Sequence, residues 1–280
     1  MATTPSLTRL DDLALREAAS GRSRTELIAH DLQLLEQEQA LYERLLARYR
    51  AGEPLSYLLG HKEFFGRPFW VSPASLIPRP ETEGLVKIGL EWVKAEGHRF
   101  SEALPLRLLD LGTGSGCLAI TLSLELQALG IATVCYATDI SEKALELARN
   151  NAAWLGADVR FLRGSWLQAL PDAEHQSGFD LIVSNPPYVG QDDPEFASGS
   201  LAWEPVSALL GLQPSKGGMN DLRQLVGQCL SCLKPGGILA VEHGYRQQSD
   251  VINAFAEAGF LKITPSHDLA GRPRNVQGRL

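Results

Sequence analysis

Cysteine is scarce in this sequence, and long apolar runs are missing. The 280 residues include only 4 cysteines, too few and too scattered to form a disulfide framework. No segment approaches the roughly 18 uninterrupted apolar residues of a membrane-spanning helix, and the acidic first dozen residues do not match a secretory signal peptide. These absences predict reduced thiols, no membrane partner and a cytoplasmic location.

Metal-binding patterns are also missing from the sequence. Cys229 and Cys232 form a C-x-x-C, but there is neither a second cysteine pair nor a histidine pair at zinc spacing to complete a site. The 6 histidines fall in no ligand spacing either. We therefore interpret the two thiols as packing residues of a helix, and we expect no metal.

The sequence also has fewer basic than acidic residues. The chain has 26 Lys and Arg against 33 Asp and Glu, which gives a formal net charge of -7 at pH 7. Such a chain has no overall positive field to draw it onto phosphate backbones, so we expect no direct nucleic-acid partner, although a local basic groove is compatible with this total. With 44% hydrophobic and 21% charged residues, the composition indicates a folded globular protein.

The patterns that are present divide the chain into three segments. In residues 1–52 the apolar residues recur at helical spacing, and Ser23 with Glu26 predicts a capping box that opens the main helix. Residues 53–82 are rich in proline and hold an alternating apolar run, which predicts a β-hairpin linker. Residues 83–280 alternate apolar strands with helical stretches, the pattern of a parallel sheet covered by helices.

The third segment therefore predicts an α/β fold with a seven-stranded, mostly parallel sheet. Its strands are expected at 107–111, 133–138, 159–163, 179–184, 238–242, 262–264 and 275–277. Its helices are expected to begin near Glu83, Ser115, Glu142, Met219 and Gln248. Ligands of such sheets bind at the carboxyl ends of the strands, so the loops that follow the strands are the candidates for a site.

A glycine-rich loop follows the first strand of this sheet. It comprises Gly112, Thr113, Gly114, Ser115 and Gly116. Its alternate glycines let a ligand lie against the backbone, and the next helix offers free N–H groups. A tight turn without a ligand is the alternative interpretation.

An acidic residue, Asp139, ends the second strand. A carboxylate at this place could accept hydrogen bonds from both hydroxyls of a ribose. An N-cap on the following helix is the alternative, although Ser141 could already serve as that cap. Because the loop lacks the G-x-G-x-x-G spacing, the pair predicts a cofactor without a pyrophosphate.

The sequence Asn185-Pro186-Pro187-Tyr188 closes the strand at 179–184. Two consecutive prolines stiffen the backbone, and because neither has an N–H, nearby carbonyl oxygens can point at a ligand beside the side-chain oxygen of Asn185. Tyr188 offers an aromatic face against which a planar substrate group can rest. A proline turn followed by a core tyrosine is the alternative interpretation.

These groups suit methylation of a planar amide or amine nitrogen. The lone pair of such a nitrogen is delocalised, so acceptors on its two N–H groups favour a pyramidal nitrogen and stabilise the positive charge that develops there. The methyl donor would be a sulfonium. A general base is not required, because the amide proton can leave after the methyl group has arrived.

The glycine loop, Asp139 and the N-P-P-Y sequence together resemble class I S-adenosylmethionine-dependent methyltransferases that act on nitrogen. The stretches Glu63–Gly66, Val71–Glu83 and Glu242–Gly244 are similar to the bacterial release factor glutamine methyltransferases, the PrmC/HemK family. The resemblance covers the chain from about residue 53 to its end and implies a Rossmann-like sheet. It also implies that the helical N-terminal segment is a separate domain for substrate recognition.

By this resemblance the cofactor is S-adenosyl-L-methionine. The glycine loop would cradle it, Asp139 would bind its ribose hydroxyls, and Trp166, after the third strand, would lie against its adenine. A core aromatic residue near a strand end is the alternative for Trp166. Asn185 would border both the cofactor and the substrate.

The resemblance also implies the substrate, which is the glutamine of the Gly-Gly-Gln motif of peptide chain release factors, methylated at N5. Asn185, Pro186 and Tyr188 would be the catalytic residues, with the Asn185 side chain and the Pro186 carbonyl accepting from the glutamine NH₂. The substrate side would also include Pro187, Arg79 and Glu81. A solvated helix start is the alternative explanation for the two charged residues.

Three other functions fit parts of the pattern. A DNA adenine N6-methyltransferase uses the same chemistry on a flipped base, but the acidic net charge and the short helical extra domain speak against it. A glutamine methyltransferase of a ribosomal protein is the second, and the run Pro78–Glu83 favours the release factor branch. A catalytically silent S-adenosylmethionine-binding module is the third, and the intact Asn185 and Tyr188 speak against that.

Overall fold

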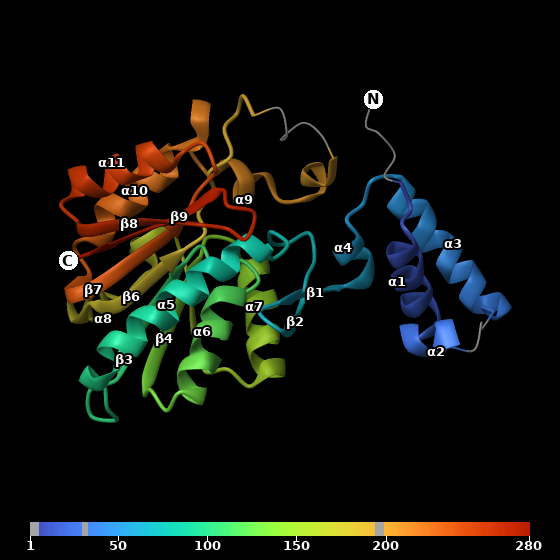
Figure 1. Cartoon of the computed structure of the whole chain (residues 1–280), viewed down its shortest axis with the longest axis horizontal. Helices are drawn as coiled ribbons and strands as arrows, with labels where there is room; N and C mark the ends of the chain where they lie inside the picture. Colours follow the sequence, from blue (N-terminus) through green and yellow to red (C-terminus); the bar gives the residue numbers. More distant parts are fainter. Residues whose placement is uncertain (1–5, 30–32, 194–198) are drawn as a thin grey trace.

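The computed structural model describes residues 6–29, 33–193 and 199–280. Figure 1 shows a group of N-terminal helices beside a larger body built around a twisted sheet, with a short hairpin between them. No helix among the described residues is long and apolar enough to cross a membrane.

Four helices make up the N-terminal part: α1 Arg9–Ser20, α2 Arg24–Ala29, α3 Glu36–Arg50 and α4 Leu55–Leu59. They share a small core of their own, in which Leu15 of α1 packs with Tyr42, Leu45 and Tyr49 of α3. Leu58 of α4 belongs to the same cluster. The apolar spacing in the sequence therefore marks the faces that these helices bury against one another.

The capping box at Ser23 and Glu26 is present, but it opens a different helix from the one expected. The backbone N–H and the hydroxyl of Ser23 donate to Glu26 Oε2 at 2.9 and 2.7 Å, at the start of the short helix α2. The main helix α3 begins at Glu36, where the backbone N–H of Leu35 donates to Glu38 Oε2 at 2.8 Å. The expectation was wrong because apolar spacing does not show where one helix ends and the next begins.

The larger body is a seven-stranded sheet in the order β5-β4-β3-β6-β7-β9-β8. Its strands are β3 Leu106–Leu111, β4 Thr133–Asp139, β5 Arg160–Arg163, β6 Phe179–Ser184, β7 Leu233–Glu242, β8 Leu261–His267 and β9 Pro273–Arg279. Strands β3 to β7 are parallel, and β9 pairs antiparallel with both β7 and β8. The mostly parallel sheet predicted from the sequence is confirmed. The main difference is β7, which begins at Leu233 because this residue pairs with Phe179 before a register shift.

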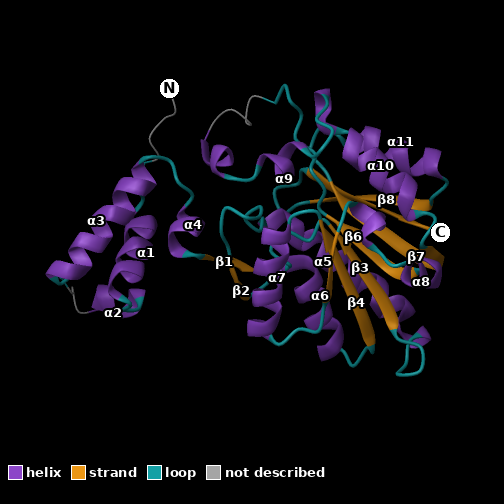
Figure 2. Cartoon of the chain, turned by 180° about the vertical axis from the view of Figure 1, so that it is seen from behind, coloured by secondary structure: helices purple, strands orange, loops and turns teal. Residues whose placement is uncertain are grey.

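Helices cover both faces of this sheet, as Figure 2 shows. The α-helices are α5 Glu83–Glu96, α6 Cys117–Ala128, α7 Glu142–Leu155, α8 Asp172–Ser177, α9 Val206–Leu210, α10 Asn220–Cys229 and α11 Gln248–Ala258. The 3-10 helices are η1 Pro80–Thr82, η2 Gly97–Arg99, η3 Trp166–Ala169, η4 Gly199–Trp203 and η5 Lys216–Gly218. Residues from α5, α6 and α7 share one buried cluster, and residues from η3, α10 and α11 share the other.

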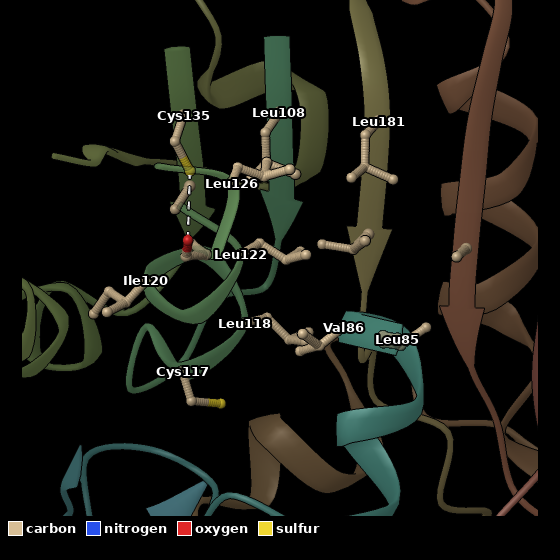
Figure 3. Packing of buried hydrophobic residues seen from close by; sticks show 14 of the residues in the cluster. Leu85, Val86, Leu108, Cys117, Leu118, Ile120, Leu122, Leu126, Cys135 and Leu181 are labelled. Carbon is tan, nitrogen blue, oxygen red and sulfur yellow. Dashed lines mark hydrogen bonds between the residues drawn. The ribbon is translucent and has the colours of Figure 1, made fainter. Parts of the chain in front are cut away.

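Alternation along the strands produces these two cores. In β3, Leu108 belongs to the cluster under α5 and α6, whereas Leu109 belongs to the cluster under α10 and α11. Figure 3 shows Leu122 and Leu126 of α6 beside Leu108, on the first of these faces. The central parallel strands β3 and β6 are thus buried on both sides, which explains their almost continuous apolar sequences.

All 4 cysteines are free and buried. The thiol of Cys135 contacts the backbone oxygen of Ala119 at 3.8 Å, the dashed line of Figure 3. Cys229 and Cys232 lie in the cluster under α10, which confirms their interpretation as packing thiols. Burial raises the pKa of Cys232 to about 12, so this residue is a thiol rather than a thiolate at neutral pH.

The predicted hairpin is also present, as β1 His61–Phe64 and β2 Arg67–Trp70. Its aromatic residues Phe64 and Phe69 are buried in the cluster under α5 and α6. Asn151 of α7 accepts from the backbone N–H of Trp70 at 2.8 Å and donates to its carbonyl at 3.1 Å. The hairpin is therefore anchored on the sheet-containing body.

Candidate active site

The loops at the carboxyl ends of β3, β4, β5 and β6 meet at one edge of the sheet and enclose a cavity. The space between its walls, including open solvent, is about 1030 Å³. The predicted site residues in its wall are Gly112, Thr113, Gly114, Ser115, Asp139, Trp166, Asn185, Pro187 and Arg79. The strand order brings together groups that are far apart in the sequence, because parallel strands all end at the same edge.

The glycine loop has a backbone that side chains would obstruct. Gly112 and Gly116 have φ values of 74° and 83°, in the left-handed region that other residues rarely adopt. A Cβ on Gly116 would lie 2.8 Å from Ile120 Cδ1, and one on Gly112 would lie 3.4 Å from the indole of Trp166. Because Gly116 is left-handed, α6 begins at Cys117 rather than at Ser115, where the sequence predicted it.

Asp139 ties this loop to the end of β4. Its Oδ2 accepts from the backbone N–H of Gly114 at 2.9 Å, and its Oδ1 accepts from the backbone N–H of Ser141 at 2.8 Å. Ser141 itself caps α7, since its hydroxyl accepts from the N–H of Ala144 at 3.2 Å. Burial raises the pKa of Asp139, and the two N–H groups oppose this rise. The carboxylate thus belongs to the cavity wall rather than to the helix cap.

Trp166 lines the cavity beside the glycine loop. It has a φ of 48°, an uncommon value for a residue with a bulky side chain. Its ring packs partly against the cluster under α10 and lies against Gly112. Such backbone strain is concentrated at ligand sites, where the surrounding structure enforces it.

Asn185 lines the cavity, and the nitrogen of its side-chain amide is held by a hydrogen bond. Its Nδ2 donates to Thr82 Oγ1 at 3.0 Å, and the hydroxyl of Thr82 donates to Glu242 Oε2 at 2.6 Å. Because the single hydroxyl proton of Thr82 is used on Glu242, its oxygen can only accept from Asn185. The network therefore orients the amide, and Asn185 Oδ1 has no partner among the residues that the structure describes.

Glu242 anchors this network, although the sequence motifs assign it no role of its own. It ends β7, is fully buried, and accepts from Thr82 and from the hydroxyl of Tyr188, the latter at 2.9 Å. Burial raises the pKa of Glu242, whereas the two hydroxyl donors lower it. The sequence did point to Glu242 and Thr82, because both belong to stretches that resemble the family. Their contact with each other could not be predicted, because it depends on strand order.

Pro186 and Tyr188 are not among the described residues that line the cavity, unlike their neighbours Asn185 and Pro187. The ring of Tyr188 packs partly against the cluster under α10, and its hydroxyl is bound to Glu242. Burial and the charge of Glu242 raise the pKa of Tyr188 well above its usual value. Tyr188 is thus half-buried, with its hydroxyl held by Glu242. Its role as an aromatic face for the substrate stays a prediction.

Of the two charged residues predicted on the substrate side, Arg79 and Glu81, only Arg79 is among the described residues that line the cavity. Arg79 lines the cavity and forms an ion pair with Glu204, which is 4% exposed. Glu204 also accepts from the backbone N–H of Ile77 at 2.9 Å. Glu81 lies in η1 and is not part of the described wall. Sequence reasoning missed Glu204, because its partners are more than a hundred residues away.

Within the described ranges, no group of three or more His, Cys, Asp or Glu side chains is arranged to hold a metal ion. The polar side chains of the cavity wall are carboxylates, an amide, several hydroxyls and the guanidinium of Arg79. They suit a ligand with hydroxyl and amino groups.

Comparisons with known proteins agree with this fold. A family model described as a methyltransferase domain matches residues 105–266, and one described as a PrmC N-terminal domain matches residues 8–60. A solved structure of a methyltransferase from Pyrococcus furiosus has a TM-score of 0.51 at 18% identity, covering 78% of this chain and 91% of the other. The predicted class I methyltransferase fold, with a helical region before the catalytic domain, is confirmed.

Close relatives narrow the family further. The chain is 41% identical over 277 residues to the release factor glutamine methyltransferase of Bordetella pertussis, covering 99% of this chain and 96% of the relative. It is 36% identical over 273 residues to the release factor glutamine methyltransferase of Escherichia coli, covering 97% and 92%. These identities extend over both the helical segment and the sheet. The chain therefore belongs to the family of release factor glutamine methyltransferases.

Proposed function

We propose that this protein methylates N5 of the glutamine in the Gly-Gly-Gln motif of peptide chain release factors, using S-adenosyl-L-methionine. Membership of the family supports the reaction and the substrate class. The observation that carries the proposal is the amide of Asn185, whose oxygen is left without a partner among described residues at the wall of the cavity. A fixed acceptor is what a delocalised amide nitrogen needs in order to become a nucleophile.

The residues present fit the proposed cofactor. The side-chain-free surface at Gly112 lets a ligand approach the backbone, and Asp139 retains lone pairs for hydroxyl donors beside the two N–H groups it already accepts. Trp166 supplies an aromatic wall for a planar base. When bound there, S-adenosyl-L-methionine supplies a methyl group activated by a sulfonium. The adenine, ribose and loop assignments of these residues are part of the proposal.

The chain's own contribution to the reaction is to bind and orient the glutamine. Asn185 Oδ1 accepts from the carboxamide NH₂, with the carbonyl of Pro186 proposed as the second acceptor. Holding both protons turns the nitrogen lone pair toward the line of attack and stabilises the charge that develops on nitrogen. Pro187, in the cavity wall, excludes water on this side. Tyr188 acts through Glu242 by fixing the carboxylate that orients Thr82 and Asn185.

We also propose the division of the chain and its setting. Residues 1–52 form the substrate-recognition domain, residues 53–82 the hairpin linker, and residues 83–280 the methyltransferase domain. The separate core of the N-terminal helices supports a helical domain at this end of the chain, although α4, within residues 53–82, also packs into that core. The release factor is the proposed partner, and the free, buried thiols support a cytoplasmic location.

Methyl transfer from labelled S-adenosyl-L-methionine tests the proposed function. The purified protein should label a purified release factor and leave unlabelled a release factor whose Gly-Gly-Gln glutamine is replaced by alanine, because the methylated nitrogen is then missing. Scintillation counting and mass spectrometry of the modified peptide measure the result. Equal labelling of the two factors would contradict the proposal, and labelling of a ribosomal protein in place of the factor would favour the alternative glutamine methyltransferase.

The carboxylate of Asp139 gives a test of the cofactor site. Replacing Asp139 by alanine should weaken binding of S-adenosylhomocysteine by about tenfold or more, because both the ribose acceptors and the anchor of Gly114 are lost, each a hydrogen bond to a charged group. Isothermal titration calorimetry measures the affinity. Glu142→Ala is the matched control, since this neighbouring acid pairs with Arg149 on the exposed side of α7. Unchanged affinity in Asp139→Ala would remove Asp139 from the site.

A further inference from the structure

Asp221 is a carboxylate in the wall of the cavity to which the reaction assigns no role. It lies in the first turn of α10 and is 6% exposed. Among the described residues it has no hydrogen-bond or ion-pair partner. Burial raises the pKa of Asp221, as expected for a carboxylate that is desolvated without compensation.

Asp221 differs from the other buried carboxylates in having no hydrogen-bond partner among the described residues. Each of the others in the described part of the chain has at least one partner that donates to it. These pairs are Glu53 with Arg48, Asp110 with Thr113, Asp180 with Lys234, Glu204 with Arg79, and Glu242 with Thr82. A buried carboxylate left unpaired destabilises the fold, so its presence in a cavity indicates a partner that arrives with the ligand.

Asp221 is buried in the cavity wall, and its surroundings offer it no hydrogen-bond partner among the described residues. The neighbouring wall includes the apolar residues Pro205, Ala208 and Leu212. Asp221 Oδ2 lies directly against Gly211, because a Cβ built on that glycine would be 1.8 Å from it. The N–H of Gly211 is used elsewhere, on the carbonyl of Ser207 at 3.1 Å. The protein therefore supplies shape and an apolar environment but no donor.

The group of the ligand that Asp221 would bind can be inferred from the assignments of the other polar residues in the cavity wall. Asp139 is proposed for the ribose hydroxyls and Asn185 for the glutamine amide, while the charge of Arg79 is paired with Glu204. The amino groups of the cofactor, on its adenine and on its methionine part, then have no carboxylate assigned to them. Asp221 is on the same face of the sheet as Trp166, since α10 and the ring of Trp166 share one buried cluster.

We propose that Asp221 is a cofactor-binding residue that accepts a hydrogen bond from an amino group of bound S-adenosyl-L-methionine. The inference rests on the proposed function and names a further contact of the same site. Asp221 thus recognises N–H donors, where Asp139 recognises hydroxyls. The carboxylate weakens the ligand-free fold and strengthens the complex.

Calorimetric binding of S-adenosylhomocysteine tests this assignment without relying on turnover. Asp221→Ala should bind it about tenfold or more weakly, a change of about 1.4 kcal/mol. The isosteric Asp221→Asn should also bind it more weakly, because the amide loses the charge. Asp250→Ala is the control, since Asp250 is an exposed acid in the first turn of α11, and its affinity should stay within about twofold.

A second ligand locates the amino group. 5′-Methylthioadenosine keeps the adenine but lacks the α-ammonium group. If both ligands lose affinity in Asp221→Ala, the donor is the adenine amino group, whereas a loss confined to S-adenosylhomocysteine assigns the ammonium. Unchanged affinity for both ligands, with a raised KM for the release factor, would overturn the proposal and place Asp221 on the substrate.

Thermal unfolding of the ligand-free variants provides a readout that a purely structural residue would not give. Because burial raises the pKa of Asp221 in the folded state, its ionised form destabilises the fold above the unfolded-state pKa. At neutral pH both Asp221 variants should therefore have a higher Tm without ligand, while binding the ligand more weakly. A lower Tm together with unchanged binding would show a structural role. Failure of the wild-type protein to bind S-adenosylhomocysteine would instead overturn the proposed function itself.

Discussion

Replacing Asn185 by alanine should lower kcat for methyl transfer by about 10²–10³-fold, the usual effect of removing one group that stabilises a developing charge. The side-chain oxygen of Asn185 is the acceptor that the network leaves to the cavity. Its hydrogen bond strengthens as the glutamine nitrogen becomes positive, so the loss falls on kcat rather than on ground-state binding. Steady-state kinetics with a release factor measure kcat, and calorimetry should show an S-adenosylhomocysteine affinity within about twofold of wild type.

Asn150→Ala is the matched control for this experiment. Asn150 is an exposed asparagine of α7 outside the cavity wall, so its loss should change neither kcat nor affinity. If Asn185→Ala retained wild-type kcat, the amide would not be the acceptor, and the proposed chemistry of the site would be wrong. If it lost cofactor affinity with kcat unchanged, Asn185 would belong to the cofactor alone.

Replacing Thr82 by valine should lower both the stability and the rate. Valine has nearly the same shape but leaves the N–H of Asn185 and one oxygen of Glu242 without a partner, which costs about 1–3 kcal/mol for a buried group. The freed amide of Asn185 can then rotate, so kcat should fall about tenfold or more while cofactor affinity stays near wild type. Chemical denaturation and steady-state kinetics measure the two effects.

Thr121→Val is the control that separates the loss of the Thr82 hydrogen bonds from the general effect of replacing a buried threonine by valine. Thr121 is fully buried in α6, and its Oγ1 has no hydrogen-bond partner among the described residues. The same substitution there should leave the free energy of unfolding unchanged or slightly increased, with no change in kcat. Equal losses in the two variants would show that the hydrogen bonds of Thr82 do not position Asn185.

Local patterns in the sequence were sufficient for the architecture. Apolar segments alternating with helices predicted the seven strands, most plainly the central parallel strands β3, β4, β6 and β7, because these are buried on both faces. Loops that follow parallel strands lie at one edge of the sheet, so their positions in the sequence already predict that the glycine loop, Asp139 and Asn185 meet there. Apolar spacing also indicated the N-terminal helices, but it assigned the capping box of Ser23 to the wrong helix.

The class of fold, the family and the residues that end the central strands therefore follow from the amino-acid sequence alone. How those residues are held depends on the three-dimensional packing. Thr82 and Glu242 are 160 residues apart, and Asn185 is 103 residues from Thr82, yet one chain of hydrogen bonds joins them and holds the hydroxyl of Tyr188. Such contacts depend on strand order and on the packing of loops, which no local spacing encodes. For the same reason, only the folded chain reveals that Asp221 is buried in the cavity wall without a partner among the described residues.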